Sequence, residues 1–345
     1  MPARKSGATK ALPIHVHLEN LSSKPSIFRL SAELVRLTRR ANSDLGGSLR
    51  FTVGEDFAGL DRRLKTAHVL VTSVDALRDP RFPRRLLGEA PNLQLVQLIG
   101  AGVEGVLPLD WLPPSVQLAN ASGVHVEKAR EFLMMALIAL NARLPAIVWN
   151  QRRAHWNMIF TPLIRGKTLA VVGLGNLGRA AVAIGRMLGL KVVGVRRSGK
   201  KVPGVDRVFR PAQIVTALRH ADFIVVAAPM TPKTEHLLSR KVLEKTKRGV
   251  GIINMGRAGT VDYAALAALL RSGHVSGAVL DVHAPEPLPR SSPLWSTPNL
   301  ILSPHVSSDD LDGYMLNVMN LVCRNVRRLM SDRPLENLID RERGY

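Results

Sequence analysis

The chain has 345 residues, of which 46% are hydrophobic and 22% charged, proportions typical of a globular protein large enough for two domains. The formal net charge of +21 suggests nucleic-acid binding, but the basic residues are spread out and aromatic residues make up only 4%, so we expect no nucleic-acid partner. Apolar runs are too short to span a bilayer, and we expect no membrane partner. The one cysteine, Cys323, excludes an internal disulfide and suits a reducing compartment, which favours a cytoplasmic location.

The first third of the chain alternates strand-like and helix-like segments, a pattern that predicts a parallel α/β sheet. The expected strands are Ile14–Leu18, Leu49–Val53, His68–Ser73, Leu93–Ile99 and Val116–Ala119, and the expected helices include Ala32–Arg40 and Arg81–Gly88. A longer helix is expected from Val126 to Leu144, ending before Pro145.

The same alternation resumes further along and predicts a second parallel sheet, so the fold class is α/β with two doubly wound parallel-sheet domains. The expected strands are Leu169–Val172, Leu190–Val195, Phe223–Ala227, Val250–Asn254, Val279–Asp281 and Leu300–Leu302. The intervening helices are Ala212–Leu218, Ser239–Glu244 and Tyr263–Ser272. We expect the final helix, Leu316–Met330, to return to the first domain and to bury Cys323 as a small hydrophobic residue.

Between a predicted strand and a predicted helix, three glycines follow the spacing G-x-G-x-x-G. Gly173 allows the tight turn, Gly175 allows the backbone to approach a pyrophosphate, and Gly178 allows the helix to lie close to the strand. A pyrophosphate at this helix N-terminus is favoured by the unpaired N–H groups and the helix dipole. With Asn176 and Leu177 between the glycines, the segment predicts a dinucleotide site.

The next strand ends in Arg196, Arg197 and Ser198, where an NAD-binding domain normally carries an acidic residue for the ribose 2′-hydroxyl. A carboxylate here would repel a 2′-phosphate, whereas a guanidinium can bind it with two charge-assisted hydrogen bonds. We therefore expect NADP(H) in preference to NAD(H). The alternative is that this segment is one more basic loop in a basic chain.

In an open α/β sheet, ligands bind beyond the carboxyl ends of the strands. After Leu93–Ile99, the small residues Gly100, Ala101, Gly102 and Val103 leave backbone N–H groups available for an anionic substrate. The ends of later strands add further candidate cofactor contacts, namely Ala228, Pro229, Thr234, Met255, Gly256, Asp281 and Ser307. Asp281 has an alternative role as a helix N-cap or hydrogen-bond anchor. We predict no metal site.

Three charged or titratable residues at strand ends together suit carbonyl reduction. His305 would protonate the carbonyl oxygen, Glu286 would orient the imidazole and stabilise its cation, and Arg257 would bind a substrate carboxylate. Each has a simpler interpretation when taken alone: His305 as a loop or core histidine, Glu286 as a solvated turn residue, and Arg257 as part of the basic surface. Their order beside the dinucleotide motif favours the catalytic interpretation.

With these motifs in place, residues from about Leu93 to Ser308 resemble the D-isomer-specific 2-hydroxyacid dehydrogenases, particularly the glyoxylate/hydroxypyruvate reductase-like and phosphoglycerate dehydrogenase-like members. The shared segments are Gly100–Gly105, the helix around Glu127–Leu144, Gly173–Gly178, Asn254-x-x-Arg257 with Val261-Asp262, and Asp281-Val-x-x-x-Glu286-Pro with Pro304-His305. The chain departs from the family pattern at Ala258, where a glycine is usual, and the first 90 residues carry little that matches.

The resemblance implies a flavodoxin-like substrate domain, expected at 1–119 and completed by 306–345, and a Rossmann dinucleotide-binding domain at 120–305. It implies catalytic roles for Arg257, Glu286 and His305, substrate binding by Gly100–Val103, and a homodimer formed through the cofactor domain. The expected activity is hydride transfer between a nicotinamide and a small 2-keto or 2-hydroxy acid, with NADPH-dependent reduction of keto acids favoured. The alternatives are an NAD-dependent D-2-hydroxyacid dehydrogenase and a dinucleotide-sensing protein similar to the corepressors of this fold.

Overall fold

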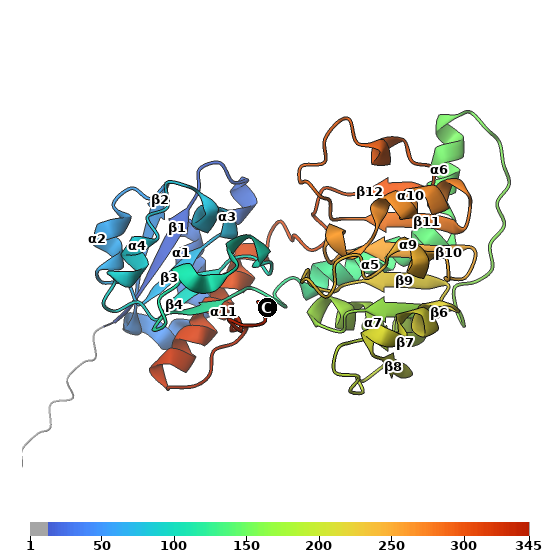
Figure 1. The fold of residues 1–345 in the computed structure, drawn as a ribbon. Coiled ribbons are helices and arrows are strands. Elements are labelled where there is room, and N and C mark those ends of the chain that lie inside the picture. Colours follow the sequence, from blue (N-terminus) through green and yellow to red (C-terminus); the bar gives the residue numbers. More distant parts are fainter. Residues whose placement is uncertain (1–12, 345) are drawn as a thin grey trace, which may run out of the picture. The chain divides into compact units, whose positions relative to one another are not determined.

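The computed structural model describes residues 13–344; residues 1–12 and 345, which belong to the expected first domain, lie outside the described part. The chain divides into two compact units, one made of residues up to 124 and from 311 onward, the other of residues 125–310 (Figure 1). The two boundaries between the units, after residues 124 and 310, each lie five residues beyond the boundaries expected from the sequence, after residues 119 and 305.

The first unit contains a five-stranded, entirely parallel sheet in the order β2-β1-β3-β4-β5. This is the flavodoxin-like strand order. Its strands are β1 (Ile14–Asn20), β2 (Leu49–Glu55), β3 (Val69–Thr72), β4 (Leu95–Leu98) and β5 (Gln117–Ala119). Its helices are α1 (Ala32–Ala41), α2 (Leu60–Leu64), α3 (Val74–Arg78), α4 (Arg85–Gly88) and α11 (Tyr314–Met330).

The second unit contains a seven-stranded parallel sheet in the order β12-β11-β10-β9-β6-β7-β8, the Rossmann arrangement with one added strand. Its strands are β6 (Thr168–Val172), β7 (Lys191–Val195), β8 (Arg207–Phe209), β9 (Phe223–Val226), β10 (Val250–Asn254), β11 (Val275–Leu280) and β12 (Leu300–Leu302). Its helices are α5 (Val126–Asn141), α6 (Leu144–Arg152), α7 (Asn176–Met187), α8 (Ile214–Leu218), α9 (Arg240–Leu243) and α10 (Tyr263–Arg271). The predicted fold class is therefore confirmed.

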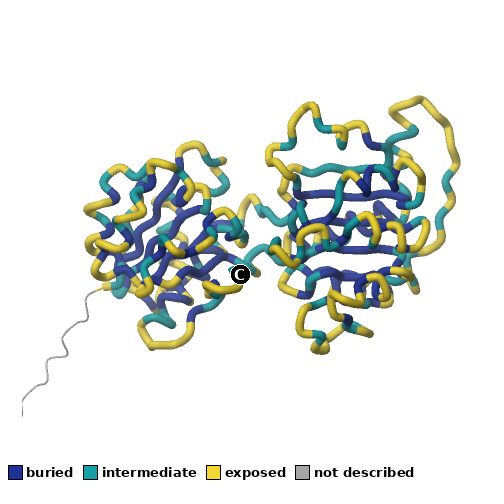
Figure 2. The backbone as a smooth tube through the Cα atoms, viewed as in Figure 1, coloured by how far each residue is buried: buried dark blue, intermediate teal, exposed yellow. Residues whose placement is uncertain are grey.

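Each sheet is buried on both faces, as expected for parallel sheets covered by helices (Figure 2). Helix α11 packs against α1, and Val318, Val322 and Val326 from one face of α11 are fully buried in that core. Cys323 lies in the same core, and burial raises the pKa of its thiol to about 11, so it is a buried small residue as predicted.

The prediction of one long helix from Val126 to Leu144 is wrong at its carboxyl end, because α5 ends at Asn141 and a separate helix, α6, begins at Leu144. Arg143 between them has a left-handed backbone (φ +58°), which breaks the helix. Pro145 lies in the first turn of α6, where its missing N–H costs no hydrogen bond. Within residues 13–344 no single helix is long and apolar enough to cross a membrane; α5 and α6, bent by 67°, meet that requirement only as a pair.

Candidate active site

The candidate residues of the second unit lie at one edge of its sheet. Because all seven strands are parallel, their carboxyl ends share that edge. The chain runs from β6 outward to β8, then crosses back to place β9 on the other side of β6. The β6–β9 boundary is thus the point where strand order reverses, the place where doubly wound sheets bind ligands.

The three glycines occupy the turn from β6 into α7, and the structure gives each a different environment. Gly173 has φ +93°, and a Cβ there would lie 2.7 Å from the Ala228 nitrogen at the end of β9. A Cβ at Gly178 would overlap the carbonyl oxygen of Gly173, so only glycine lets α7 lie this close to the strand. A Cβ at Gly175 would meet no atom within 4 Å.

This open space lies where α7 begins, since Gly175 is its N-cap and Asn176 and Leu177 form its first turn. Gly175 provides no side chain to cap the helix, so the helix dipole and backbone amides face this space. The residues present therefore fit the pyrophosphate of a dinucleotide.

Arg196 follows the last residue of β7, and its backbone N–H donates to the Phe209 carbonyl at the end of β8 (3.0 Å). Within residues 13–344 its guanidinium forms no ion pair. Arg197 and Ser198 are exposed on the turn that follows, where the Ser198 hydroxyl accepts from the Lys200 amide (3.3 Å). This strand end thus presents basic groups and a hydroxyl at the position where an NAD-binding domain normally carries an acidic residue.

The ends of β9 and β10 approach each other closely. A Cβ at Gly256 would lie 2.7 Å from the Ala228 carbonyl oxygen, and the neighbouring Met255 is buried. The Thr234 hydroxyl donates to the Pro229 carbonyl (2.7 Å) and closes the loop after β9. Ala228, Pro229 and Thr234 therefore belong to one ordered loop beside the glycine turn.

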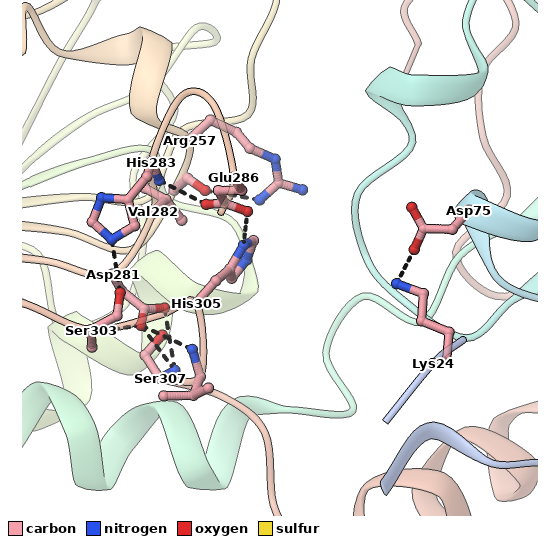
Figure 3. Close-up of polar contacts among 12 residues, drawn as sticks. Lys24, Asp75, Arg257, Asp281, Val282, His283, Glu286, Ser303, His305 and Ser307 are labelled. Atoms are coloured by element: carbon pink, nitrogen blue, oxygen red, sulfur yellow. Dashed lines mark hydrogen bonds and ion pairs between the residues drawn. The ribbon is translucent and has the colours of Figure 1, made fainter. Parts of the chain in front are cut away.

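His305 and Glu286 form a hydrogen-bonded pair, with 2.8 Å between Nδ1 and Oε2 (Figure 3). The second oxygen of Glu286 accepts from the His283 backbone N–H at 2.7 Å. Burial opposes ionisation of Glu286, but the bonds from His305 and His283 outweigh it and hold the pKa of this carboxyl below its usual value. Glu286 is therefore a carboxylate that orients the ring and leaves its Nε2 for a substrate.

Asp281 anchors the turn that carries His305. It is almost fully buried, and its carboxylate accepts from the Ser303 hydroxyl (2.7 Å) and from the amides of Val306 (3.0 Å) and Ser307 (3.2 Å), as Figure 3 shows in part. His305 itself has φ +56°, a strained backbone for a residue with a Cβ. The anchor role left open for Asp281 is the one seen here, and its contact with a cofactor stays a prediction.

Arg257 lies on the turn after β10. Its carbonyl accepts from Asn254 Nδ2 (3.1 Å) and from the Thr260 hydroxyl (2.6 Å), which fix the backbone. Its guanidinium donates from Nη1 to the Gly256 carbonyl (2.8 Å). Ala258, which departs from the family pattern, fits this turn as the buried first residue of a short 3₁₀ helix.

Gly100–Val103 lies in the first unit, directly after β4. The Gly100 carbonyl accepts from the Ala121 amide (2.9 Å) and the Ala101 carbonyl from Asn120 Nδ2 (2.7 Å), which hold the loop. The Val103 amide donates to Glu104 Oε2 (3.0 Å), so it already binds a carboxylate of the chain. The role of this loop toward substrate stays a prediction.

Three residues that were not predicted to belong to the site support it: Tyr263, His283 and Ser303. Tyr263 and Ser303 act through contacts with residues distant in the sequence, whereas His283 could be considered because it lies near Glu286, to which it donates its backbone N–H. Among the described residues, no group of three or more His, Cys, Asp or Glu side chains could hold a metal ion.

The second unit matches the sequence model of the "D-isomer specific 2-hydroxyacid dehydrogenase, NAD binding domain" over residues 134–307. The chain is 27% identical to the glyoxylate reductase of Aeropyrum pernix over 266 residues, covering 74% of this chain and 79% of that protein. It is 33% identical to the D-3-phosphoglycerate dehydrogenase of Mycobacterium tuberculosis over 244 residues, covering 70% of this chain but only 44% of that protein.

Two solved structures share this architecture over nearly the whole chain. The D-isomer specific 2-hydroxyacid dehydrogenase of Xanthobacter autotrophicus, in complex with NADPH and MES, has a TM-score of 0.79 and 27% identity and covers 97% of this chain and all of that one. The NADPH-dependent glyoxylate/hydroxypyruvate reductase of Sinorhizobium meliloti, in complex with NADP and sulfate, has a TM-score of 0.77 and 26% identity, with 96% and 100% covered. The chain therefore belongs to the D-isomer-specific 2-hydroxyacid dehydrogenases, oxidoreductases that bind a nicotinamide dinucleotide and act on small 2-hydroxy and 2-keto acids.

Proposed function

We propose that this protein reduces small 2-keto acids of the glyoxylate and hydroxypyruvate type with NADPH. The observation that carries the proposal is the Glu286–His305 pair, 2.8 Å apart, at the same sheet edge as the glycine turn and the Arg257 turn. The similarity to the glyoxylate reductase of Aeropyrum pernix and to the NADPH-dependent glyoxylate/hydroxypyruvate reductase of Sinorhizobium meliloti supports this substrate class.

The chain's own residues would supply binding and proton transfer. A bound nicotinamide supplies the hydride that reaches the carbonyl carbon. His305 gives the proton from Nε2 to the carbonyl oxygen, while Glu286 stabilises the protonated ring through Nδ1. Arg257 binds the substrate carboxylate with its planar guanidinium. Addition of the hydride to the carbonyl carbon and of the proton to its oxygen would convert the 2-oxo acid to a 2-hydroxy acid.

The preference for NADPH rests on Arg196, which is free of any carboxylate partner in the described chain and is followed by two exposed polar residues. We expect Arg196→Asp to raise the KM for NADPH at least tenfold more than the KM for NADH, because it replaces an attractive charge by a repulsive one at the 2′-phosphate. Steady-state kinetics with both cofactors measures this.

Arg219→Asp is the matched control for this variant, because it makes the same change of charge on an exposed residue at the opposite edge of the sheet. A general electrostatic effect would appear in both variants, whereas a local contact appears only at Arg196. Equal changes for NADPH and NADH in Arg196→Asp would contradict the proposed preference and favour the NAD-dependent alternative.

We also propose a homodimer formed through the second unit. The segment joining α6 to β6, which we call the arm (residues 153–165), is exposed over most of its length (Figure 2). The side chains of Trp156, Phe160 and Leu163 in the arm are 90%, 87% and 82% exposed. A pocket of about 810 Å³ lies between the arm and the amino ends of the strands. Apolar side chains exposed to this extent are typical of surfaces that are covered by a partner.

A further inference from the structure

Tyr263, the first residue of α10, connects the turns that carry Arg257 and Glu286. Its hydroxyl accepts a hydrogen bond from Asn254 Nδ2 (3.0 Å) and donates one to the Val282 carbonyl (2.8 Å). The same Asn254 amide group also donates to the Arg257 carbonyl. Burial, the largest effect, raises the pKa of Tyr263, so its hydroxyl remains a donor throughout the neutral range.

The contact with Val282 reaches Glu286 through a single peptide group. The Val282 carbonyl and the His283 N–H are the two ends of that peptide, and the N–H donates to Glu286 Oε1 at 2.7 Å. A donor at a peptide oxygen polarises the group and makes its N–H a stronger donor. Tyr263 therefore strengthens a bond that stabilises the carboxylate facing His305.

Asn254 completes this connection on the Arg257 side. It is fully buried, and its Oδ1 accepts from the Gly256 amide (3.1 Å), so both ends of its side chain are used. Hydrogen bonds thus continue from the Arg257 carbonyl through Asn254, Tyr263 and the Val282–His283 peptide to Glu286 and His305 (Figure 3 shows the part from Val282 onward).

We propose that Tyr263 is a positioning residue, which sets the protonation of Glu286 through the Val282–His283 peptide and holds the Arg257 turn at a fixed distance from it. This inference rests on the proposed reduction of keto acids. Among the described residues, the Tyr263 hydroxyl bonds to Asn254 and Val282, and it acts through these neighbours.

Other ionisable groups near this connection also have hydrogen bonds that do not involve the Tyr263 hydroxyl. Glu286 is bonded to the ring of His305 and to the backbone N–H of His283, whose ring bonds to the Ser303 carbonyl, and Tyr263 lies near Asp281. Arg257 lies on the adjoining turn and keeps its bond from Thr260. A change in the titration of Glu286 after loss of the hydroxyl therefore reports on the peptide contact.

Tyr263→Phe removes one oxygen atom and preserves the ring. We expect the acidic limb of the kcat/KM profile for glyoxylate to move to higher pH by about half a unit, because Glu286 loses part of its stabilisation. The KM for glyoxylate should rise roughly threefold or more as the Arg257 turn loosens, while the Kd for NADPH stays unchanged.

Ser276→Ala is the matched control. It deletes a buried hydroxyl that donates to the Val250 carbonyl (3.2 Å). This bond joins β11 to β10 near their amino ends, whereas Tyr263 contacts residues at the carboxyl ends of these two strands. It should lower the melting temperature as much as Tyr263→Phe does without moving the acidic limb or the KM. If Tyr263→Phe also lowers only the melting temperature, Tyr263 is purely structural and the inference is wrong.

A second readout does not depend on turnover. Carbon-13 NMR of glutamate carboxyls, with Glu286→Gln to assign the signal, should show a higher Glu286 pKa in Tyr263→Phe than in the wild type. A wild type that reduces no 2-keto acid would overturn the proposed function, whereas an unchanged Glu286 pKa in an active variant would overturn this inference alone.

Discussion

Glu286 is the residue through which pH acts on the proposed reaction. Its pKa is held below the ordinary value of 4.5 by bonds from His305 and His283 that outweigh burial. A carboxyl with a lowered folded-state pKa stays ionised as the pH falls through the ordinary range, and its contacts are lost only when the pH passes the lowered value. The His305–Glu286 pair should thus survive mild acid.

Glu286→Gln should lower kcat/KM by about 10²-fold and abolish the acidic limb that this carboxyl causes, because an amide does not titrate and stabilises the imidazolium poorly. The pH profile of kcat/KM for glyoxylate, measured for the wild type and the variant, tests both effects. An acidic limb that persists unchanged in Glu286→Gln would assign it to another group.

At the scale of single residues, the sequence predicted which side chains are candidates for the site, but not the residues that hold them in place. Arg257, Glu286 and His305 could be identified because strand ends and the family resemblance select them. The bond from Tyr263 to Val282 could not, because it joins residues 19 positions apart through a backbone carbonyl. The left-handed backbone of His305 also has no signal in its neighbours.

At the scale of one element, the glycines in the turn between β6 and α7 have two different functions. Gly178 is required by packing, since a Cβ would overlap the Gly173 carbonyl, whereas Gly175 faces open space. Folding should therefore depend on the first, and cofactor binding on the second.

We expect Gly175→Ala to keep the wild-type melting temperature but to raise the Kd for NADPH at least tenfold, because the methyl group occupies space needed by the pyrophosphate. Gly178→Ala should instead destabilise the protein by about 1–3 kcal/mol through overpacking. Calorimetry and fluorescence titration of NADPH compare the two. Similar losses of stability in both variants would show that Gly175 is also a packing position.

Elements with a strong apolar pattern were predicted well, and those set by single backbone conformations were not. Strands β1, β2, β9 and β10 lie within two residues of the predicted bounds. The break between α5 and α6 depends on Arg143, and β8, with three residues, is too short to be distinguished from a loop. His15 and His17 of β1 are buried and linked through Thr52, although their alternation is that of an exposed face.

At the scale of the whole molecule, the proposed homodimer can be tested by changing the exposed arm. Replacing Trp156 and Phe160 together by serine should convert a dimer into a monomer of 37.7 kDa, because it removes the apolar surface that a second copy would cover. Analytical ultracentrifugation measures the mass. Leu311→Ser, at a residue 77% exposed in the first unit, is the control that should leave the dimer intact. A wild-type protein that sediments as a monomer would contradict the proposal.

In the proposed reaction, the second unit holds the dinucleotide and the catalytic pair. The step that defines this reaction is the transfer of a proton from His305 to the carbonyl oxygen. A dinucleotide-sensing protein of the same fold would bind NADPH without needing that step, so binding and turnover must be measured on the same variant.

The most direct measurement is therefore the rate of glyoxylate reduction by NADPH in wild type and His305→Gln, with the Kd for NADPH determined in parallel. We predict that the wild type is active, that the variant loses at least about 10²-fold in kcat, and that its Kd for NADPH stays within about twofold of the wild-type value. Full activity in His305→Gln would contradict the account.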